Sequence, residues 1–315
     1  MVAPVGAQSE RIHEASGITR LGDDLYIADD SVGGACFRIA VPRNVSAVFP
    51  LNGQQPRRVR LAGGRQAVDL EGIDVLADGR LAVLSERTRS LIGEDQVIAE
   101  YDQPLGEFAK RGLEGISARP LSGGSSRVAV VWEGGYPDPP SVPRPMMAHV
   151  GRRAMRAFVL IHDLKPEARD LRIRLLDAVT SFEVDLPLPP GEEPLAQRFR
   201  ASDLVWTRLP DSSADPWGLI LLISSQNSVD QPTYQYHWLQ RFNLQGKPVG
   251  PCIDLDKVGP PSTRGANWEG LAWLEAGQRL ILVHEDDAKL EAHGLILDLP
   301  PEWRFPGKEL ANGKR

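Results

Sequence analysis

Cysteine is scarce in this sequence, and its positions exclude two common ways of stabilising a small protein. Cys36 and Cys252 are the only two cysteines among 315 residues, and no C-x-x-C pair or zinc-type Cys/His spacing occurs. A disulfide scaffold and a structural zinc site are therefore excluded. We interpret both cysteines as buried free thiols, with a bond between them as the alternative.

Long hydrophobic runs are also missing. No stretch approaches the roughly 18 consecutive apolar residues of a membrane span. The N-terminal residues MVAPVGAQSERIHEASG lack the positive start and apolar core of a secretory signal. We therefore expect no membrane interaction and a cytoplasmic location, or a periplasmic or secreted one if a signal peptide has been removed.

The chain has no excess of positive charge. Its 36 Lys and Arg residues face 42 Asp and Glu residues, for a net charge of −6. A broad electrostatic interaction with nucleic acid is not expected at this balance, so any anionic ligand must be held locally. We expect a monomer that acts on a small anionic, phosphorylated molecule.

Several motifs of well-known enzyme classes are absent. The sequence has no G-x-S-x-G, H-E-x-x-H, P-loop or G-x-G-x-x-G motif, and no repeated Trp-Asp signature. Apolar positions alternate as in strands and do not follow the helical period, which disfavours a parallel α/β fold. The 30 Gly and 26 Pro residues are scattered between the apolar runs, as is typical of a turn-rich, all-β protein.

A short pattern recurs five times along the chain. It consists of a small or apolar residue, then Ser or Glu, then a turn residue, then Ile or Leu. We call its second position the ring position. The five copies are Ala15-Ser16-Gly17-Ile18, Leu70-Glu71-Gly72-Ile73, Leu113-Glu114-Gly115-Ile116, Ala201-Ser202-Asp203-Leu204 and Trp268-Glu269-Gly270-Leu271.

Each copy is followed by a turn-prone stretch and a β-rich run, which predicts a hairpin, and further strand-like runs follow. Five four-stranded units predict a five-bladed β-propeller. A six-bladed propeller is the alternative, with the extra blade in residues 165–190. The repeats indicate a single domain over 1–315, with an inserted loop at 136–156 and a loose C-terminal tail at 306–315.

In a propeller the first strand of every blade lines the central channel, so the ring positions are expected to face one axis. They supply three carboxylates and two hydroxyls, and such an oxygen-only set suits a hard cation, Ca²⁺ more than Mg²⁺. A structural explanation competes with this one, because Glu followed by Gly at a strand entrance often only caps a turn. The predicted calcium ligands are Ser16, Glu71, Glu114, Ser202 and Glu269.

Antiparallel pairing returns the end of the second strand to the same mouth, which predicts a second ring. Its members are Asp29, Glu86, Glu133, Gln226 and Glu285. Acidic residues follow directly at Asp30 and Asp286. At these two positions the residue that faces the mouth could therefore be the next one along the chain.

Several other residues are candidates for chemistry at this mouth. Glu86 and Glu133 are the preferred general bases, and His284 is a candidate proton shuttle, although a solvated histidine is the alternative. Basic residues near the ring are candidates for binding an anion, against the alternative that they only balance nearby acids. They are Arg65, Arg111, Arg200, Arg264 and, in the inserted loop, His149.

The segments EASGITRLGDDLYIADD, VDLEGIDVLADGRLAVLSER, RGLEGIS and NWEGLAWLEAGQRLILVHEDD resemble the blade motifs of bacterial phytase-like or esterase-like β-propeller proteins. The Ser, Glu, Glu, Ser, Glu order of the ring is also similar to that of the calcium-activated nucleotidase (apyrase) family. That resemblance implies a five-bladed propeller with one channel Ca²⁺ and hydrolysis of nucleoside diphosphates. Gly17 departs from the apyrase pattern, which has an additional acid there.

The sequence therefore predicts a calcium-dependent hydrolase of phosphate esters or anhydrides, with Ca²⁺ as its cofactor. A metal ion in such a funnel neutralises developing charge and lowers the pKa of a bound water. Two alternatives stay open. One is a calcium-dependent lactonase or carboxylic esterase, and the other is a non-catalytic propeller that calcium stiffens for binding a partner.

Overall fold

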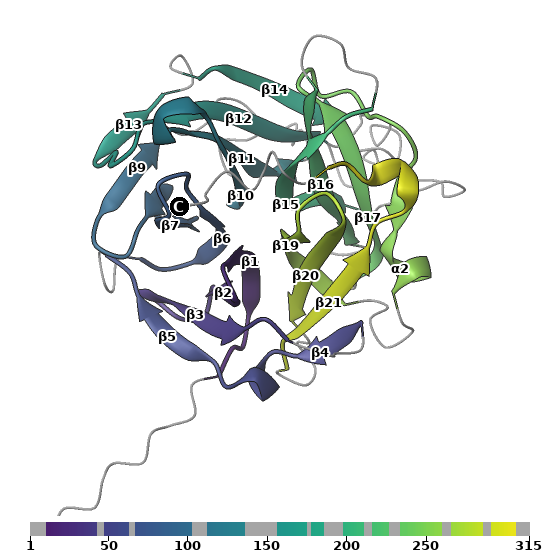
Figure 1. Cartoon of the computed structure of the whole chain (residues 1–315), viewed down its shortest axis with the longest axis horizontal. Helices are drawn as coiled ribbons and strands as arrows, with labels where there is room; N and C mark the ends of the chain where they lie inside the picture. Colours follow the sequence, from purple (N-terminus) through teal and green to yellow (C-terminus); the bar gives the residue numbers. More distant parts are fainter. Residues whose placement is uncertain are drawn as a thin grey trace, which may run out of the picture.

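Five sheets, antiparallel except for one parallel pair of strands, are arranged radially around a central axis in the computed structural model (Figure 1). The structure describes residues 11–42, 47–62, 67–102, 112–135, 156–174, 178–185, 198–210, 216–226, 234–259, 266–285 and 291–306. The inner strands β1, β6, β10, β15 and β19 contact one another in sequence order, and β19 contacts β1, which closes the circle. This is a five-bladed β-propeller, as the repeat predicted.

The blades are numbered along the chain, and their strands are given from the axis outward. Blade 1 contains β1 (Ala15–Leu21), β2 (Asp24–Asp29), β3 (Ala35–Ala40) and β5 (Arg57–Arg60). Blade 2 contains β6 (Leu70–Val75), β7 (Leu81–Ser85), β8 (Ser90–Ile92), β9 (Val97–Tyr101) and β13 (Leu171–Ile173). Blade 3 contains β10 (Leu113–Pro120), β11 (Ser126–Gly135), β12 (Arg156–Leu164) and β14 (Thr180–Asp185).

Blade 4 contains β15 (Arg198–Arg208), β16 (Trp217–Gln226), β17 (Tyr234–Asn243) and β18 (Ile253–Asp254). Blade 5 contains β19 (Asn267–Glu275), β20 (Arg279–Glu285), β21 (His293–Asp298) and β4 (Val48–Pro50). Helical segments in the described ranges are single turns: η1 (Asn52–Gln54), η4 (Ser122–Gly124), α2 (Leu255–Val258) and η7 (Pro301–Trp303). Among the described helices, none has the length and apolar character needed to cross a membrane.

Two blades lend a strand to a neighbour. After β3, the chain crosses to blade 5, where β4 pairs with β21, and then returns to blade 1 as β5. After β12, the chain pairs β13 in parallel with β9 of blade 2 and then returns to blade 3 as β14. The described strands of this region, β13 and β14, therefore belong to blades 2 and 3, and the alternative of a sixth blade there is wrong.

The hydrophobic core is divided among the five gaps between adjacent blades. Each cluster of buried apolar side chains draws on two neighbouring sheets, such as Trp206 of blade 4 packed with Val159 of blade 3. The other four gaps have equivalent clusters. Burial of both faces of every sheet holds the blades in fixed positions around the axis.

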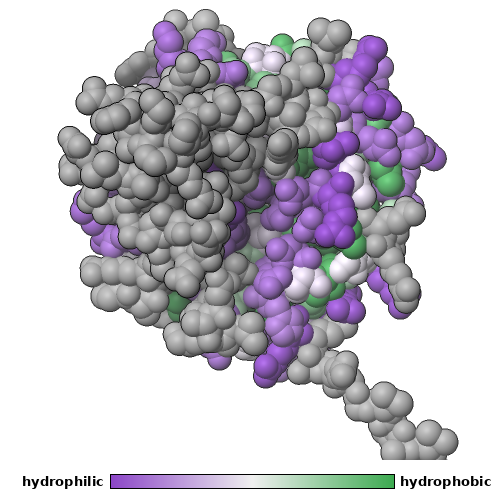
Figure 2. All heavy atoms as spheres, turned by 180° about the vertical axis from the view of Figure 1, so that it is seen from behind, coloured by the Kyte–Doolittle hydropathy of each residue, from purple (hydrophilic) through white to green (hydrophobic). Residues whose placement is uncertain are grey.

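The described surface is mostly hydrophilic on the face shown in Figure 2. Four large apolar residues of the described ranges are exposed, and they lie on separate segments: Leu21, Leu171, Val179 and Val258. Both cysteines are free thiols, as predicted, with Cys36 buried and Cys252 only partly so. The inserted loop up to residue 155 and the tail from residue 307 lie outside the described ranges.

Every inner strand has a break in its pairing at the ring position. The register shifts between Ala15 and Gly17, and the same break occurs in each of the other four inner strands at its own ring position. A β-bulge of this kind leaves one residue unpaired and changes the direction of its side chain. Each copy of the recurring sequence pattern therefore marks a β-bulge in an inner strand.

The glycine after the ring residue allows neighbouring inner strands to approach closely. A Cβ on Gly17 would lie 2.2 Å from the carbonyl oxygen of Glu71, and one on Gly72 would lie 2.7 Å from the amide nitrogen of Ile116. A Cβ on Gly270 would in turn lie 2.9 Å from Cα of Gly17. At these glycines the backbones of neighbouring inner strands are in contact, so there is no room for a side chain.

We expect Gly17→Ala to lower the free energy of unfolding by about 1–3 kcal/mol, because the new methyl group overlaps backbone atoms that cannot rotate away. Urea unfolding of both proteins measures the change. Gly93→Ala is the matched control, since its Cβ would meet the carbonyl oxygen of Gln96 at 3.4 Å, an ordinary contact. Equal stability of the two variants would contradict the close-approach explanation.

Candidate functional site

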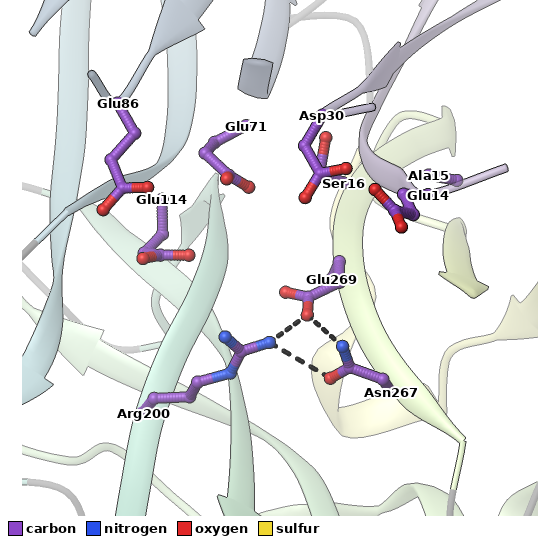
Figure 3. Close-up of a pocket in the computed structure, with 10 residues that line it drawn as sticks. All are labelled: Glu14, Ala15, Ser16, Asp30, Glu71, Glu86, Glu114, Arg200, Asn267 and Glu269. Atoms are coloured by element: carbon purple, nitrogen blue, oxygen red, sulfur yellow. Dashed lines mark hydrogen bonds and ion pairs between the residues drawn. The ribbon is translucent and has the colours of Figure 1, made fainter. Parts of the chain in front are cut away.

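A cavity of about 320 Å³ lies at the end of the channel where the inner strands begin and the second strands end. Ten described residues line it, and Figure 3 shows their side chains facing a shared space. They are Glu14, Ala15, Ser16, Asp30, Glu71, Glu86, Glu114, Arg200, Asn267 and Glu269. Six are carboxylic acids, and among the described lining residues Arg200 is the one base.

Four of the five predicted ring residues line this cavity. Glu71, Glu114 and Glu269 reach it from three different blades, and Ser16 reaches it from a fourth (Figure 3). Ser202 was expected beside them but is not among the lining residues. It is 1% exposed, and its hydroxyl oxygen lies 3.3 Å from Oγ of Ser224.

The second ring is one residue out of register in blade 1. Asp29 was predicted to face the mouth, but its carboxylate accepts hydrogen bonds from the amides of His13 and Ser31 and from the Ser31 hydroxyl. It therefore fixes the turn after β2. Burial raises its pKa, and the hydrogen bonds from Ser31 and His13 oppose that shift. The next residue, Asp30, lines the cavity in its place.

Glu86 lines the cavity, as predicted. Its amide donates to the carbonyl oxygen of Asp69, and its carboxylate lies where a Cβ on Gly112 would be, so a glycine leaves the space for it. For Glu133, Gln226 and Glu285 the structure describes the backbone, at the ends of β11, β16 and β20, while their side chains lie outside the described part.

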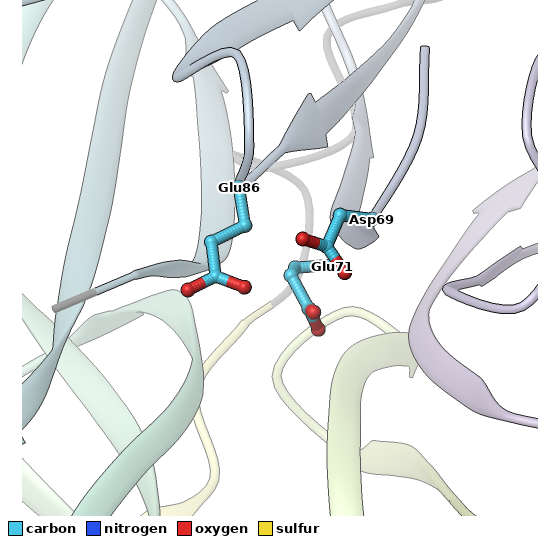
Figure 4. A group of neighbouring side chains, drawn as sticks. All are labelled: Asp69, Glu71 and Glu86. Atoms are coloured by element: carbon cyan, nitrogen blue, oxygen red, sulfur yellow. The ribbon is translucent and has the colours of Figure 1, made fainter. Parts of the chain in front are cut away.

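Asp69, Glu71 and Glu86 form a separate group at one side of the cavity. One carboxylate oxygen of each lies within 4.8 Å of the others, a spacing that can hold a metal ion (Figure 4). Asp69, Glu14 and Asn267 were not among the predicted site residues, and Asp30 was named only as the register alternative to Asp29. Glu14, Asp69 and Asn267 each stand two residues before a ring position, so a wider definition of the repeat would have included all three.

Arg200 is tied to blade 5 (Figure 3). Its Nη2 donates to Oε1 of Glu269 and, at 3.0 Å, to Oδ1 of Asn267, while Nδ2 of Asn267 donates to the same oxygen of Glu269. Its Nε lies 3.4 Å from Oγ of Ser224. The other predicted anion-binding residues, Arg65, Arg111, Arg264 and His149, lie outside the described residues.

Burial raises the pKa of Glu71 well above its usual range, and the nearby carboxylates of Glu269, Asp30 and Glu86 raise it further. The guanidinium of Arg200 opposes this shift. Ionisation of all the acids in the cavity at once is therefore unfavourable, because their negative charges repel one another. A bound cation would reduce that repulsion.

Two further acids are buried behind the ring. Asp74 accepts hydrogen bonds from Thr19 of blade 1 and from the amide of Ala118 of blade 3. Asp203 accepts from the amides of Leu204 and, in blade 5, Leu271. Burial raises the pKa of both. These carboxyl groups connect neighbouring inner strands and are not among the residues that line the cavity.

His284 was considered as a proton shuttle, but it is 5% exposed and packs in the core beside the channel. Its ring packs edge to face against the ring of Trp268, with 4.7 Å between the ring centroids, and stacks on the ring of His293, with 5.4 Å between the centroids. Strand alternation explains this position, because His284 pairs with Trp268, which faces the gap between blades and precedes the ring residue. A role in proton transfer at the cavity does not follow from this arrangement.

No protein-family model matches the chain, and no curated protein matches its sequence. Solved structures are similar to this chain at low identity. A streptogramin B lyase is 9% identical, with a TM-score of 0.36, over 94% of this chain and 86% of that one. An α-L-arabinanase from Penicillium chrysogenum, complexed with arabinobiose, is 10% identical, with a TM-score of 0.43, over 91% and 94%.

A calcium structure of a Trichoderma reesei carbohydrate-active enzyme of family AA12 is 12% identical, with a TM-score of 0.42, over 92% of this chain and 94% of that one. At these identities the similarity concerns the fold alone. No sequence match supports the resemblance to phytase-like proteins or to calcium-activated nucleotidases.

We expect Glu71→Gln to raise the free energy of unfolding by about 1 kcal/mol at neutral pH in the presence of a chelator, because it removes one of several crowded like charges. Thermal or urea unfolding measures the change. Glu100→Gln on the exposed face of β9 removes the same charge away from the cavity and should be neutral. A loss of stability in the Glu71 variant would contradict the repulsion argument.

Proposed function

We propose that this protein is a calcium-dependent hydrolase whose site is the acidic cavity at the channel mouth. The observation that carries the proposal is the convergence of Glu71, Glu114 and Glu269 from three blades into one small cavity, with Ser16 from a fourth. A bulge directs each of these residues to the axis, so the arrangement repeats around the channel and does not depend on a single loop.

The cavity residues fit a hard divalent cation. The carboxylates and the Ser16 hydroxyl offer oxygen atoms as metal ligands, and the described lining residues include six acids and one base. Oxygen donors in a roomy radial arrangement suit Ca²⁺ better than the strict octahedron of Mg²⁺. Ser16, Glu71, Glu114 and Glu269 would hold the ion. We leave Ser202 out of this set because it is buried against Ser224.

When bound, the ion would polarise the bond to be cleaved and lower the pKa of water. Glu86 reaches the cavity from the second strand of blade 2 and is placed to accept a proton from that water. Asp30 and Glu14 add negative charge beside Ser16. These carboxylates also exclude anions from the cavity until its charge is neutralised.

Phosphate esters or anhydrides are the substrates that we propose first. The resemblance of the blade motifs to phytase-like proteins and of the ring to calcium-activated nucleotidases supports this choice. The substrate would be a small anion that Arg200 contacts, as guanidinium groups pair well with phosphate oxygens.

A lactone or carboxylic ester is the second candidate. It is favoured by the engagement of Arg200 with Glu269, because the one base among the described lining residues is already paired with an acid. A neutral carbonyl substrate meets less repulsion from six carboxylates than a phosphate does.

Hydrolysis of chromogenic phosphate mono-, di- and triesters, a lactone and a carboxylic ester, each with Ca²⁺ and with a chelator, tests the proposal. We expect chelator-sensitive turnover of a phosphate ester. Turnover of the lactone or carboxylic ester alone would select the second candidate. An absence of turnover on every substrate, together with a calcium-dependent melting temperature, would replace both with a calcium-stiffened binding protein.

We expect Glu114→Gln and Glu86→Gln to differ. Glu114→Gln removes a ring carboxylate and should lower calcium affinity and turnover together, each by roughly tenfold or more. Glu86→Gln should lower turnover by about 10²-fold while calcium affinity changes little, because its role is to accept a proton. Calorimetry and steady-state kinetics measure the two quantities.

Unchanged calcium binding in Glu114→Gln would remove Glu114 from the metal site. An equal loss of affinity in both variants would instead make Glu86 a ligand, together with Asp69 and Glu71, with which it forms a close group.

A further inference from the structure

Arg200 is the one basic residue among the described residues that line the acidic cavity. It extends from the inner strand of blade 4, two residues before the ring position Ser202, and crosses to blade 5. Its side chain is 17% exposed, and that of Glu269 is 11% exposed. Water screens the attraction between two charges with so little exposure only in part, and removing one of them would leave the other without compensation.

The partner of Arg200 is one of the ring carboxylates. Oε1 of Glu269 accepts from Nη2 of Arg200 and from Nδ2 of Asn267 at the same time. Asn267 also accepts from Nη2 through its Oδ1, at 3.0 Å. The three side chains form a closed triangle, which holds the guanidinium against the carboxylate that a metal ion in the ring would need.

The influence of Arg200 extends past this triangle. Besides Glu269, it shares the cavity with Glu71 and four further acids. Arg200 therefore supplies part of the counter-charge for carboxylates on two sides of the cavity. A divalent cation in the ring would provide the same compensation and would be repelled by Arg200.

We propose that Arg200 is an internal cation that competes with the metal ion for Glu269 and so sets the metal affinity of the cavity. This inference rests on the proposed metal site. Arg200 has two consequences: it stabilises the protein without metal, and it weakens metal binding until the ion displaces the guanidinium from Glu269. Asn267 keeps Glu269 in place when Arg200 leaves, because it donates to the same oxygen.

Calcium titration of the full chain by calorimetry tests this. Arg200→Gln should bind calcium roughly tenfold more tightly than the wild type, since a unit charge next to a divalent ion has been removed. Arg208→Gln is the matched control. Arg208 is on the same strand, eight residues farther along, and its guanidinium lies over the ring of Trp217 at 5.6 Å. Its removal should leave calcium affinity unchanged.

Melting temperatures with and without calcium provide a second test. They distinguish competition with the metal from a purely structural role of Arg200. In a chelator, Arg200→Gln should melt below the wild type, because the acids lose their counter-charge. Saturating calcium should then raise its melting temperature by more than it raises that of the wild type, since tighter binding stabilises more at equal calcium. If Arg200 had only a structural role, its substitution would lower the melting temperature by the same amount in chelator and in saturating calcium.

The possible failures are distinct. Calcium affinity in Arg200→Gln that equals or falls below that of the wild type overturns the competition and leaves the proposed metal site intact. If neither protein binds calcium, the proposed metal site and the competition fail together. Tighter binding in Arg208→Gln as well would show a general charge effect and would also overturn the specific role of Arg200.

Discussion

The close packing of five inner strands around one axis is the constraint on which the rest of the structure depends. Where Gly17 meets Glu71 and Gly72 meets Ile116, backbone atoms of neighbouring strands leave no space for a Cβ. A glycine directly after the ring residue permits that contact, and the bulge changes the direction of the ring side chain, which faces the cavity in both blades. Scaffold and site therefore use the same residues.

Blade 4 solves the same packing problem with an acid. Asp203 stands where the other blades have glycine, and its Oδ1 lies 2.4 Å from where a Cβ on Gly115 would be. Its carboxyl group bonds to the amide of Leu271 in blade 5, as that of Asp74 bonds to the amide of Ala118 in blade 3. The two acids add hydrogen bonds with exact partners to the close backbone contacts between these strands, and the bonds offset part of the cost of burying a carboxyl group, which raises the pKa of both.

The sequence predicted what depends on local chemistry and missed what depends on distant pairing. The bulge motif is local, so the five blades and the positions of Glu71, Glu114 and Glu269 followed from it. Asp29 was misplaced by one residue because its carboxylate bonds to nearby amides in a turn, which alternation alone does not predict. The pairings of β4 with β21 and of β13 with β9 were not predicted, because each strand and its partner are far apart in the sequence. No local pattern encodes a pairing of that kind.

The cavity concentrates charge that a flexible protein would not hold together. Glu71 is disfavoured as an ion by burial and by its acidic neighbours, and this repulsion acts to push the blades apart at the mouth. Apolar packing in all five gaps opposes that force, and the ion pair of Arg200 with Glu269 reduces it between blades 4 and 5. The rigid frame thus holds acidic side chains close together, and a cation bound among them would offset their mutual repulsion.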